Sequence, residues 1–149
     1  MANIIEQFIA YAGDFERTLA DDDWGRLRQY FTEDAIYDVK SDAFGGRMSG
    51  PTAIFAGMKK SLDGLDRRFT KRDIEVTEPP QVTGDEMTVG WKVLYEISGH
   101  PPFVMRGRSK VRYAGTKIAH LEDTFENDTE KDLATWRRQT GIEVDPSYT

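Results

Sequence analysis

The sequence contains no cysteine and only two histidines in 149 residues. The absence of cysteine excludes disulfides, thiolate nucleophiles and zinc sites built from cysteine. Two histidines are few for a metal centre, and no His-x-His, His-Glu-x-x-His, P-loop or Rossmann glycine pattern is present. We therefore predict neither a metal ion nor a nucleotide cofactor.

Long apolar runs and an excess of positive charge are also missing. No apolar run is long enough to cross a bilayer, and no basic region precedes an apolar segment at the N-terminus, so we expect no membrane partner, no export signal and a cytoplasmic protein. The 20 Lys and Arg against 26 Asp and Glu give a net charge of -6, which repels phosphate backbones. This charge argues against nucleic-acid binding.

What remains is a globular chain with 38% hydrophobic and 31% charged residues. Its length is that of one compact domain, and no linker or internal repeat divides it. We predict a single domain over residues 1–149, with a core at about 4–126 and a C-terminal helix and tail at 127–149.

The first half of the chain has apolar residues at helical spacing. These residues and a capping box of Asn3 and Glu6 predict a first helix that ends near Ala20. A second, short helix is predicted after Asp23, which can cap it, and a third over Pro51–Gly64, because proline is tolerated in a first helical turn. The apolar positions of the three helices are Ile4, Phe8, Tyr11, Phe15, Leu19, Trp24, Leu27, Phe31, Ile54, Met58 and Leu62.

Beyond Gly64 the apolar pattern changes to a period of two, which is typical of strands. Residues 87–97 and 103–113 alternate most clearly, and the turn between them predicts a long antiparallel hairpin. Further strands are predicted at 35–39, 69–76 and 117–125. We expect Pro79 and Pro80 to end the middle one of these three.

The last predicted element is a C-terminal helix. Thr129 can cap it, Leu133 and Trp136 share one of its faces, and Gly141 supplies a stop. Because an exposed Trp–Leu face favours aggregation, we expect this helix to pack against the body or a partner. The order of the elements predicts an α+β fold in which three N-terminal helices pack on a curved, mainly antiparallel sheet, with a short C-terminal helix.

Three segments carry a family resemblance. They are Tyr30–Tyr37 (YFTEDAIY), Gly50–Ile54 (GPTAI) and Lys117–Phe125 (KIAHLEDTF). In these segments and in element order the chain resembles the SnoaL-like branch of the nuclear transport factor 2-like superfamily, whose members include ketosteroid isomerases, polyketide cyclases and limonene epoxide hydrolases. The resemblance implies a cone-shaped sheet wrapped around helices, a pocket inside the cone, and a homodimer through the outer face of the sheet.

Asp123 is the main candidate for chemistry. It shares a spacing of two with the apolar residues Ala119, Leu121 and Phe125, so period-two geometry puts its carboxylate on the same inward, apolar face of its strand. Burial would raise its pKa above the reference of ~3.9 and poise it as a general acid or base. The resemblance also puts Asp123 where limonene epoxide hydrolases and polyketide cyclases carry a functional Asp. The alternative is an Asp that accepts bonds from a turn or pairs with Arg.

The resemblance further implies that Tyr37 faces the cone, where its hydroxyl could polarise a carbonyl or hold a water molecule. The alternative is a packed core tyrosine with one satisfied hydroxyl. Aromatic and soft apolar residues could line a pocket for a ring-containing or hydrophobic ligand, or simply form the core. The residues predicted to bind the ligand are Trp24, Phe55, Met58, Trp91, Tyr95, Phe103 and Leu121.

Two departures from the family patterns argue against particular reactions. Val39 stands where a ketosteroid isomerase would carry its base. The second Asp and the Arg of a limonene epoxide hydrolase are missing, because the aligned stretch, residues 90–93, reads Gly-Trp-Lys-Val, although Lys92 could replace one charged member if the register differs. His120 is expected on the outer face of the sheet, and Asp38 also points away from the pocket unless its short strand bulges.

Two classes of function remain open. As an enzyme, the chain would bind a small hydrophobic or polyketide-like molecule and use Asp123 for proton transfer or water activation, with Tyr37 as polar partner. Cofactor-free isomerase, cyclase or hydrolase chemistry fits this reading. As a noncatalytic module, the same cone would bind a ligand or be filled, and the dimer surface or the C-terminal tail would carry the interaction. The direction of the Asp123 side chain and the space beside it discriminate between the two.

Overall fold

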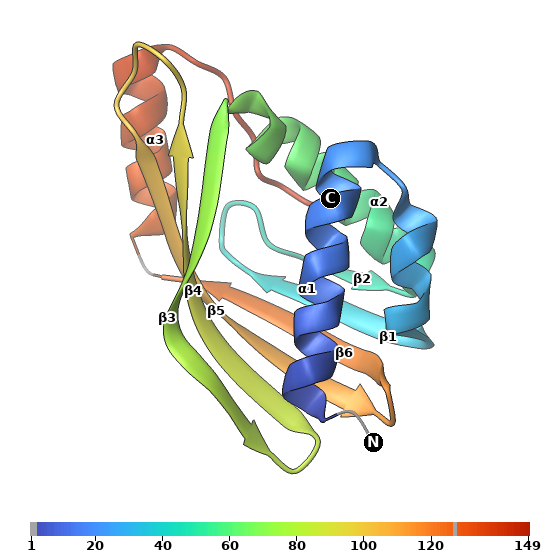
Figure 1. The fold of residues 1–149 in the computed structure, drawn as a ribbon. Helices are drawn as coiled ribbons and strands as arrows, with labels where there is room; N and C mark the ends of the chain where they lie inside the picture. Colours follow the sequence, from blue (N-terminus) through green and yellow to red (C-terminus); the bar gives the residue numbers. More distant parts are fainter. Residues whose placement is uncertain (1–2, 127) are drawn as a thin grey trace.

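The computed structural model describes residues 3–126 and 128–149 (Figure 1). Its helical elements are α1 (Ile4–Asp21), the 3-10 helix η1 (Trp24–Tyr30), α2 (Pro51–Gly64), the 3-10 turn η2 (Asp66–Arg68) and α3 (Thr129–Thr140). Its strands are β1 (Phe31–Lys40), β2 (Gly46–Ser49), β3 (Lys71–Thr83), β4 (Glu86–Glu96), β5 (Phe103–Ala114) and β6 (Lys117–Phe125). The predicted α+β class is confirmed.

The six strands form one sheet in the order β2-β1-β6-β5-β4-β3. The predicted hairpin is confirmed, because β4 and β5 pair antiparallel from Glu86↔Arg112 to Tyr95↔Phe103. Among the described strands only β1 and β6 pair in parallel, in the middle of the sheet, and their register puts Val39 opposite Asp123. The first and last strands of the chain therefore meet where the candidate carboxylate lies.

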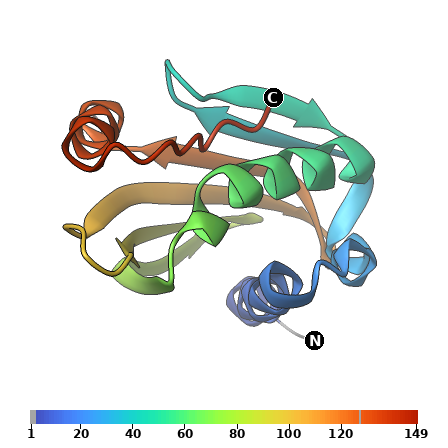
Figure 2. The ribbon, with the colours of Figure 1, turned by 90° about the horizontal axis from the view of Figure 1, so that it is seen from above.

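The helices cover one face of the sheet. Figures 1 and 2 show the sheet curving around α1 and α2, while α3 lies beside the end of the β4–β5 hairpin. No element of the described chain covers the opposite, outer face. The concave side is thus enclosed on several sides, and the outer side is open.

The start of the sheet differs from the prediction. The second helix is a short 3-10 helix that ends at Tyr30, and β1 begins at Phe31 rather than at Ala35. Phe31 pairs with Ile118, and the register shifts before Ile36. Phe31 satisfies both a helical stripe and a strand pattern, so the local sequence could not decide between them.

Two further strand predictions were incomplete. No strand was predicted between residues 40 and 50, yet β2 pairs with β1 there. β3 continues to Thr83 instead of ending before Pro79 and Pro80. It is an edge strand with two register shifts in this stretch, and an edge strand tolerates prolines because half of its N–H groups need no partner.

The C-terminal helix packs against the body, as predicted. Leu133 and Trp136 are each 3% exposed, and the Trp136 indole N–H donates to the carbonyl of Pro101 at 2.8 Å. Gly141 adopts the left-handed conformation that ends the helix. The predicted cap was wrong: Thr129 is buried as the first helical residue, and Asp128 precedes it as the N-cap.

The tail after α3 runs back along α2 toward β2, where Thr149 lies beside Gly46. The Asp145 N–H donates to the Gly64 carbonyl at 2.9 Å, and the Ser61 hydroxyl donates to the Pro146 carbonyl at 2.6 Å. A Cβ on Gly64 would lie 2.0 Å from the Asp145 carbonyl oxygen, so this approach requires glycine. The tail ends with the Tyr148 ring against Tyr37.

Replacing the α3 anchor tests this packing. We expect Trp136→Ala to lower the free energy of unfolding by about 3–5 kcal/mol, because it leaves a cavity and removes a buried hydrogen bond. Urea unfolding followed by circular dichroism measures the change. Exposed Gln139→Ala on the same helix is the control and should change stability by less than about 0.5 kcal/mol. Equal effects of the two substitutions would show that α3 is loosely attached.

Candidate functional site

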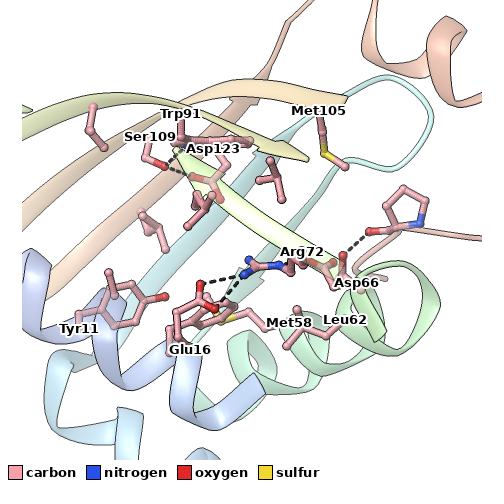
Figure 3. A pocket seen from close by; sticks show the side chains of 18 of the residues that line it. Tyr11, Glu16, Met58, Leu62, Asp66, Arg72, Trp91, Met105, Ser109 and Asp123 are labelled. Atoms are coloured by element: carbon pink, nitrogen blue, oxygen red, sulfur yellow. Dashed lines mark hydrogen bonds and ion pairs between the residues drawn. The ribbon is translucent and has the colours of Figure 1, made fainter. Parts of the chain in front are cut away.

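A cavity of about 370 Å³ lies between α1, α2 and the concave face of the sheet (Figure 3). Its wall is mostly apolar. Three of its lining residues, Ile9 of α1 with Ile74 and Val76 of β3, are also exposed to solvent, so the cavity opens between these two elements. The charged residues in the described part of its wall are Glu16, Asp66, Arg72 and Asp123.

Asp123 faces this cavity from β6. The Tyr37 hydroxyl donates to its Oδ2 at 2.6 Å, and the Ser109 hydroxyl donates to its Oδ1 at 2.6 Å. None of the ion pairs among the described residues includes Asp123. The carboxyl group is thus held by two neutral donors, and no cation in the described part of the chain pairs with it.

Neighbouring strands position these donors. Ser109 lies directly opposite Asp123 in the β5–β6 register, and the Trp91 indole N–H donates to the Ser109 hydroxyl oxygen at 2.9 Å. A Cβ on Gly107 would lie 2.6 Å from the Trp91 ring. Glycine at 107 therefore lets the indole cross β5, and the indole then fixes the Ser109 hydroxyl in its role as donor to Asp123.

Burial dominates the electrostatics of the site. It raises the pKa of Asp123, while the hydrogen bonds from Ser109 and Tyr37 act in the opposite direction and the charge of Glu122 adds to the rise. Burial and the nearby Asp123 charge also raise the pKa of Tyr37, so Tyr37 stays protonated and donates. Asp123 is consequently easier to protonate than an ordinary surface aspartate.

A second polar cluster lies across the cavity, as Figure 3 shows. Arg72 of β3 donates from Nε to Asp66 at 2.6 Å and from Nη1 to both carboxylate oxygens of Glu16 at 2.9 Å. The Tyr95 hydroxyl also donates to Asp66, at 3.1 Å. Burial raises the pKa of Asp66 in spite of the Arg72 charge. This cluster, the Arg72 cluster, joins α1 to the sheet beside the cavity mouth.

The structure brings most of the predicted site residues together. Asp123, Tyr37, Met58, Trp91, Tyr95 and Leu121 all line the cavity. Their catalytic and ligand-binding roles stay predictions.

Three predicted lining residues lie elsewhere. Trp24 and Phe55 pack on each other, with ring centroids 5.8 Å apart, in the aromatic core between η1 and α2. Phe103 is covered by Trp136 of α3. An alternating or helical pattern gives the face of a residue, but only the tertiary packing decides which inward residues another element covers.

The sequence reasoning missed several polar residues of the cavity. Tyr11, which belongs to the stripe of α1, is 6% exposed, and its hydroxyl points toward the cavity without a hydrogen-bond partner among the described residues (Figure 3). Ser109 could have been found from its inward register. Arg72 and Tyr148 gave no local signal, because a long-range contact places each of them.

The outer face holds the groups that were expected there. His120 Nε2 lies 2.7 Å from Asp38 Oδ2, and Arg47 approaches the same carboxylate at 3.9 Å. Lys92 pairs with Glu75 at 3.4 Å and does not line the cavity, so it supplies no charged partner for Asp123.

The described residues contain no group of three or more His, Asp or Glu side chains that could hold a metal ion. None of the helices in the described ranges is long and apolar enough to cross a membrane.

Comparison with known proteins identifies the family. Residues 14–140 match the SnoaL-like domain family. The chain belongs to this family. No curated protein matches the sequence. The SnoaL-like chain has the nuclear transport factor 2-like fold of its structural neighbours, and at their low sequence identity these neighbours show the fold alone.

An NTF2-like protein of unknown function from Burkholderia pseudomallei is 13% identical to the chain; the match covers 94% of this chain and 99% of the neighbour, with a TM-score of 0.68. TerC, co-crystallised with polyporic acid, is 16% identical, with 88% and 97% covered and a TM-score of 0.65. A hypothetical protein with a ketosteroid isomerase-like fold from Catenulispora acidiphila, in complex with trimethylamine, is 20% identical, with 89% and 92% covered and a TM-score of 0.60.

The raised pKa of Asp123 predicts a pH-dependent difference in stability. A carboxyl group whose pKa is higher in the folded than in the unfolded state stabilises the fold below the unfolded value of ~3.9, and this contribution is lost as pH rises through the folded pKa. The melting temperature of Asp123→Asn minus that of the parent should therefore increase from acid to neutral pH. Thermal unfolding by calorimetry at several pH values measures this difference.

The control is Asp73→Asn, because the Asp73 side chain is 59% exposed on the outer side of β3. Its difference from the parent should vary much less over the same range. A difference for Asp123→Asn that stays flat or falls with pH would contradict the assigned shift.

Proposed function

We propose that this SnoaL-like protein binds a small hydrophobic or polyketide-like molecule in its cavity and uses Asp123 for acid–base chemistry on it. The observation that carries the proposal is a cavity-facing carboxyl group with a raised pKa, held by two neutral donors inside an apolar wall. A carboxyl group works best as a proton carrier when its pKa lies near the working pH.

The arrangement suits cofactor-free isomerase, cyclase or hydrolase chemistry. Asp123 would take a proton from a carbon acid or a water molecule on the ligand side and return it later in the cycle. Ser109, held as a donor by Trp91, would keep bonding Oδ1 in both protonation states, and the Tyr37 hydroxyl could rotate to accept when Oδ2 carries the proton. The uncommitted Tyr11 hydroxyl could donate to a ligand oxygen where negative charge develops.

Neighbours with the same fold support the binding of organic molecules. TerC was crystallised with polyporic acid, and the Catenulispora acidiphila protein with trimethylamine. The mostly aromatic and aliphatic wall of this chain's cavity suits a ring-containing ligand.

A noncatalytic ligand-binding role is the second candidate. It is favoured by the two hydrogen bonds that already occupy both carboxylate oxygens of Asp123, because these bonds give the side chain a structural role. The two candidates share the cavity and differ in whether the bound molecule is converted.

Substitution of Asp123 separates the two candidates. Once a screen of cyclic ketones, esters and epoxides has yielded a converted ligand, Asp123→Asn should lower turnover by roughly 10²-fold or more while ligand binding survives, since the proton acceptor is lost and the shape is kept. Asp73→Asn is the matched control and should leave turnover unchanged. Binding without conversion of any screened ligand would instead support the noncatalytic role. Equal turnover in Asp123→Asn would contradict the role of Asp123 in catalysis.

We also propose a homodimer through the outer face of the sheet. This face is uncovered in the described chain and carries Val104, at 36% exposure, among charged side chains. Light scattering at micromolar concentration should give about twice the chain mass of 17.0 kDa, and Val104→Lys should reduce that value. A mass near 17.0 kDa for the parent protein would contradict the dimer, and an unchanged dimer in Val104→Lys would contradict the assigned surface.

A further inference from the structure

The charges in the cavity wall are unbalanced. Among the described lining residues, three carry a carboxyl group, namely Glu16, Asp66 and Asp123, and only Arg72 carries a positive charge. The remaining lining residues are apolar or carry hydroxyl groups. A ligand that enters the cavity therefore meets more negative than positive groups.

The positive charge of Arg72 is already paired with two carboxylates. Its side chain is 13% exposed, and its Nε and Nη1 donate to two different carboxylates, those of Asp66 and Glu16. The Asp66 carboxylate is 9% exposed and receives a further bond from Tyr95. Removing Arg72 from this pairing to bind a ligand carboxylate would leave buried negative charge without a partner, which is strongly unfavourable.

Asp123, unlike Asp66 and Glu16, has no cationic partner among the described residues. Both of its oxygens accept bonds from neutral hydroxyls, and no cation among the described residues pairs with it. An anionic ligand beside it would either lie next to a second negative charge or require Asp123 to be protonated. An uncharged ligand avoids this penalty, and a cationic ligand would supply the missing counter-charge, helped by the aromatic faces of the wall.

We propose that the cavity selects its ligand by charge: it accepts uncharged and cationic ring compounds and excludes carboxylates. The inference rests on the proposed ligand-binding role of the cavity and narrows its ligand class. It requires no turnover, so it can be tested by binding alone.

Three planar probes of nearly equal shape provide the test: naphthalene carboxamide, naphthalene carboxylate and naphthalene amidinium, which are neutral, negative and positive at neutral pH. Isothermal titration calorimetry on the full chain should show that the carboxylate binds at least about tenfold more weakly than the carboxamide. The amidinium should bind at least as tightly as the carboxamide. Carboxylate binding that equals or exceeds carboxamide binding would overturn the proposal.

Two variants test the origin of the selectivity. Asp123→Asn and Glu16→Gln should each narrow the gap between carboxylate and carboxamide, because each removes one negative charge from the wall. Glu75→Gln is the matched control, since Glu75 pairs with Lys92 on the outer face and should leave the gap unchanged. A gap that neither cavity variant changes would overturn the electrostatic explanation.

The outcomes also separate this inference from the proposed function. If none of the probes binds to the folded protein, ligand binding fails and the charge selection fails with it. If the probes bind in the expected order but no ligand of the screen is converted, the catalytic proposal alone fails. If all three probes bind with equal affinity, ligand binding stands and the charge selection alone is wrong.

Discussion

The burial of one carboxyl group, that of Asp123, is the constraint on which the site depends. Taking a polar group out of water without partners costs about 1–3 kcal/mol in proteins, and more when the group is charged. Here β1 contributes the Tyr37 hydroxyl and β5 contributes the Ser109 hydroxyl. The parallel pairing of β1 with β6 and the antiparallel pairing of β5 with β6 are therefore both needed to hold one side chain.

Further residues hold the hydrogen-bond donors of this carboxyl group in place. Trp91 reaches Ser109 only because position 107 has no side chain, so a glycine on β5 contributes to the orientation of a carboxyl group on β6. On the far side of the cavity, the Arg72 cluster pairs one guanidinium with two carboxylates and joins α1 to the sheet. Asp123, at one end of the cavity, thus has no cationic partner among the described residues. Asp66 and Glu16, at the other end, pair with Arg72.

Periodicity located Asp123 and the long hairpin, because each depends on a local alternation that the backbone of a strand enforces. The capping box at Asn3 was equally local and is present in the structure. The errors have a common cause: at each of these positions a contact with a distant part of the chain decided the outcome. Phe31 fits two periods, β3 tolerates Pro79 and Pro80 only because it is an edge strand, and Phe103 faces inward but is covered by α3.

Composition and periodicity were enough to predict the α+β class, the order of most elements and the inward face of β6, since both act over a few neighbouring residues. The packing in three dimensions determines which inward residues border empty space and which are covered. It also brought Arg72 beside Glu16, and Tyr148 beside Tyr37, across long stretches of chain. No local pattern encodes such contacts, because they arise when the curved sheet, the helices and the tail pack on one another.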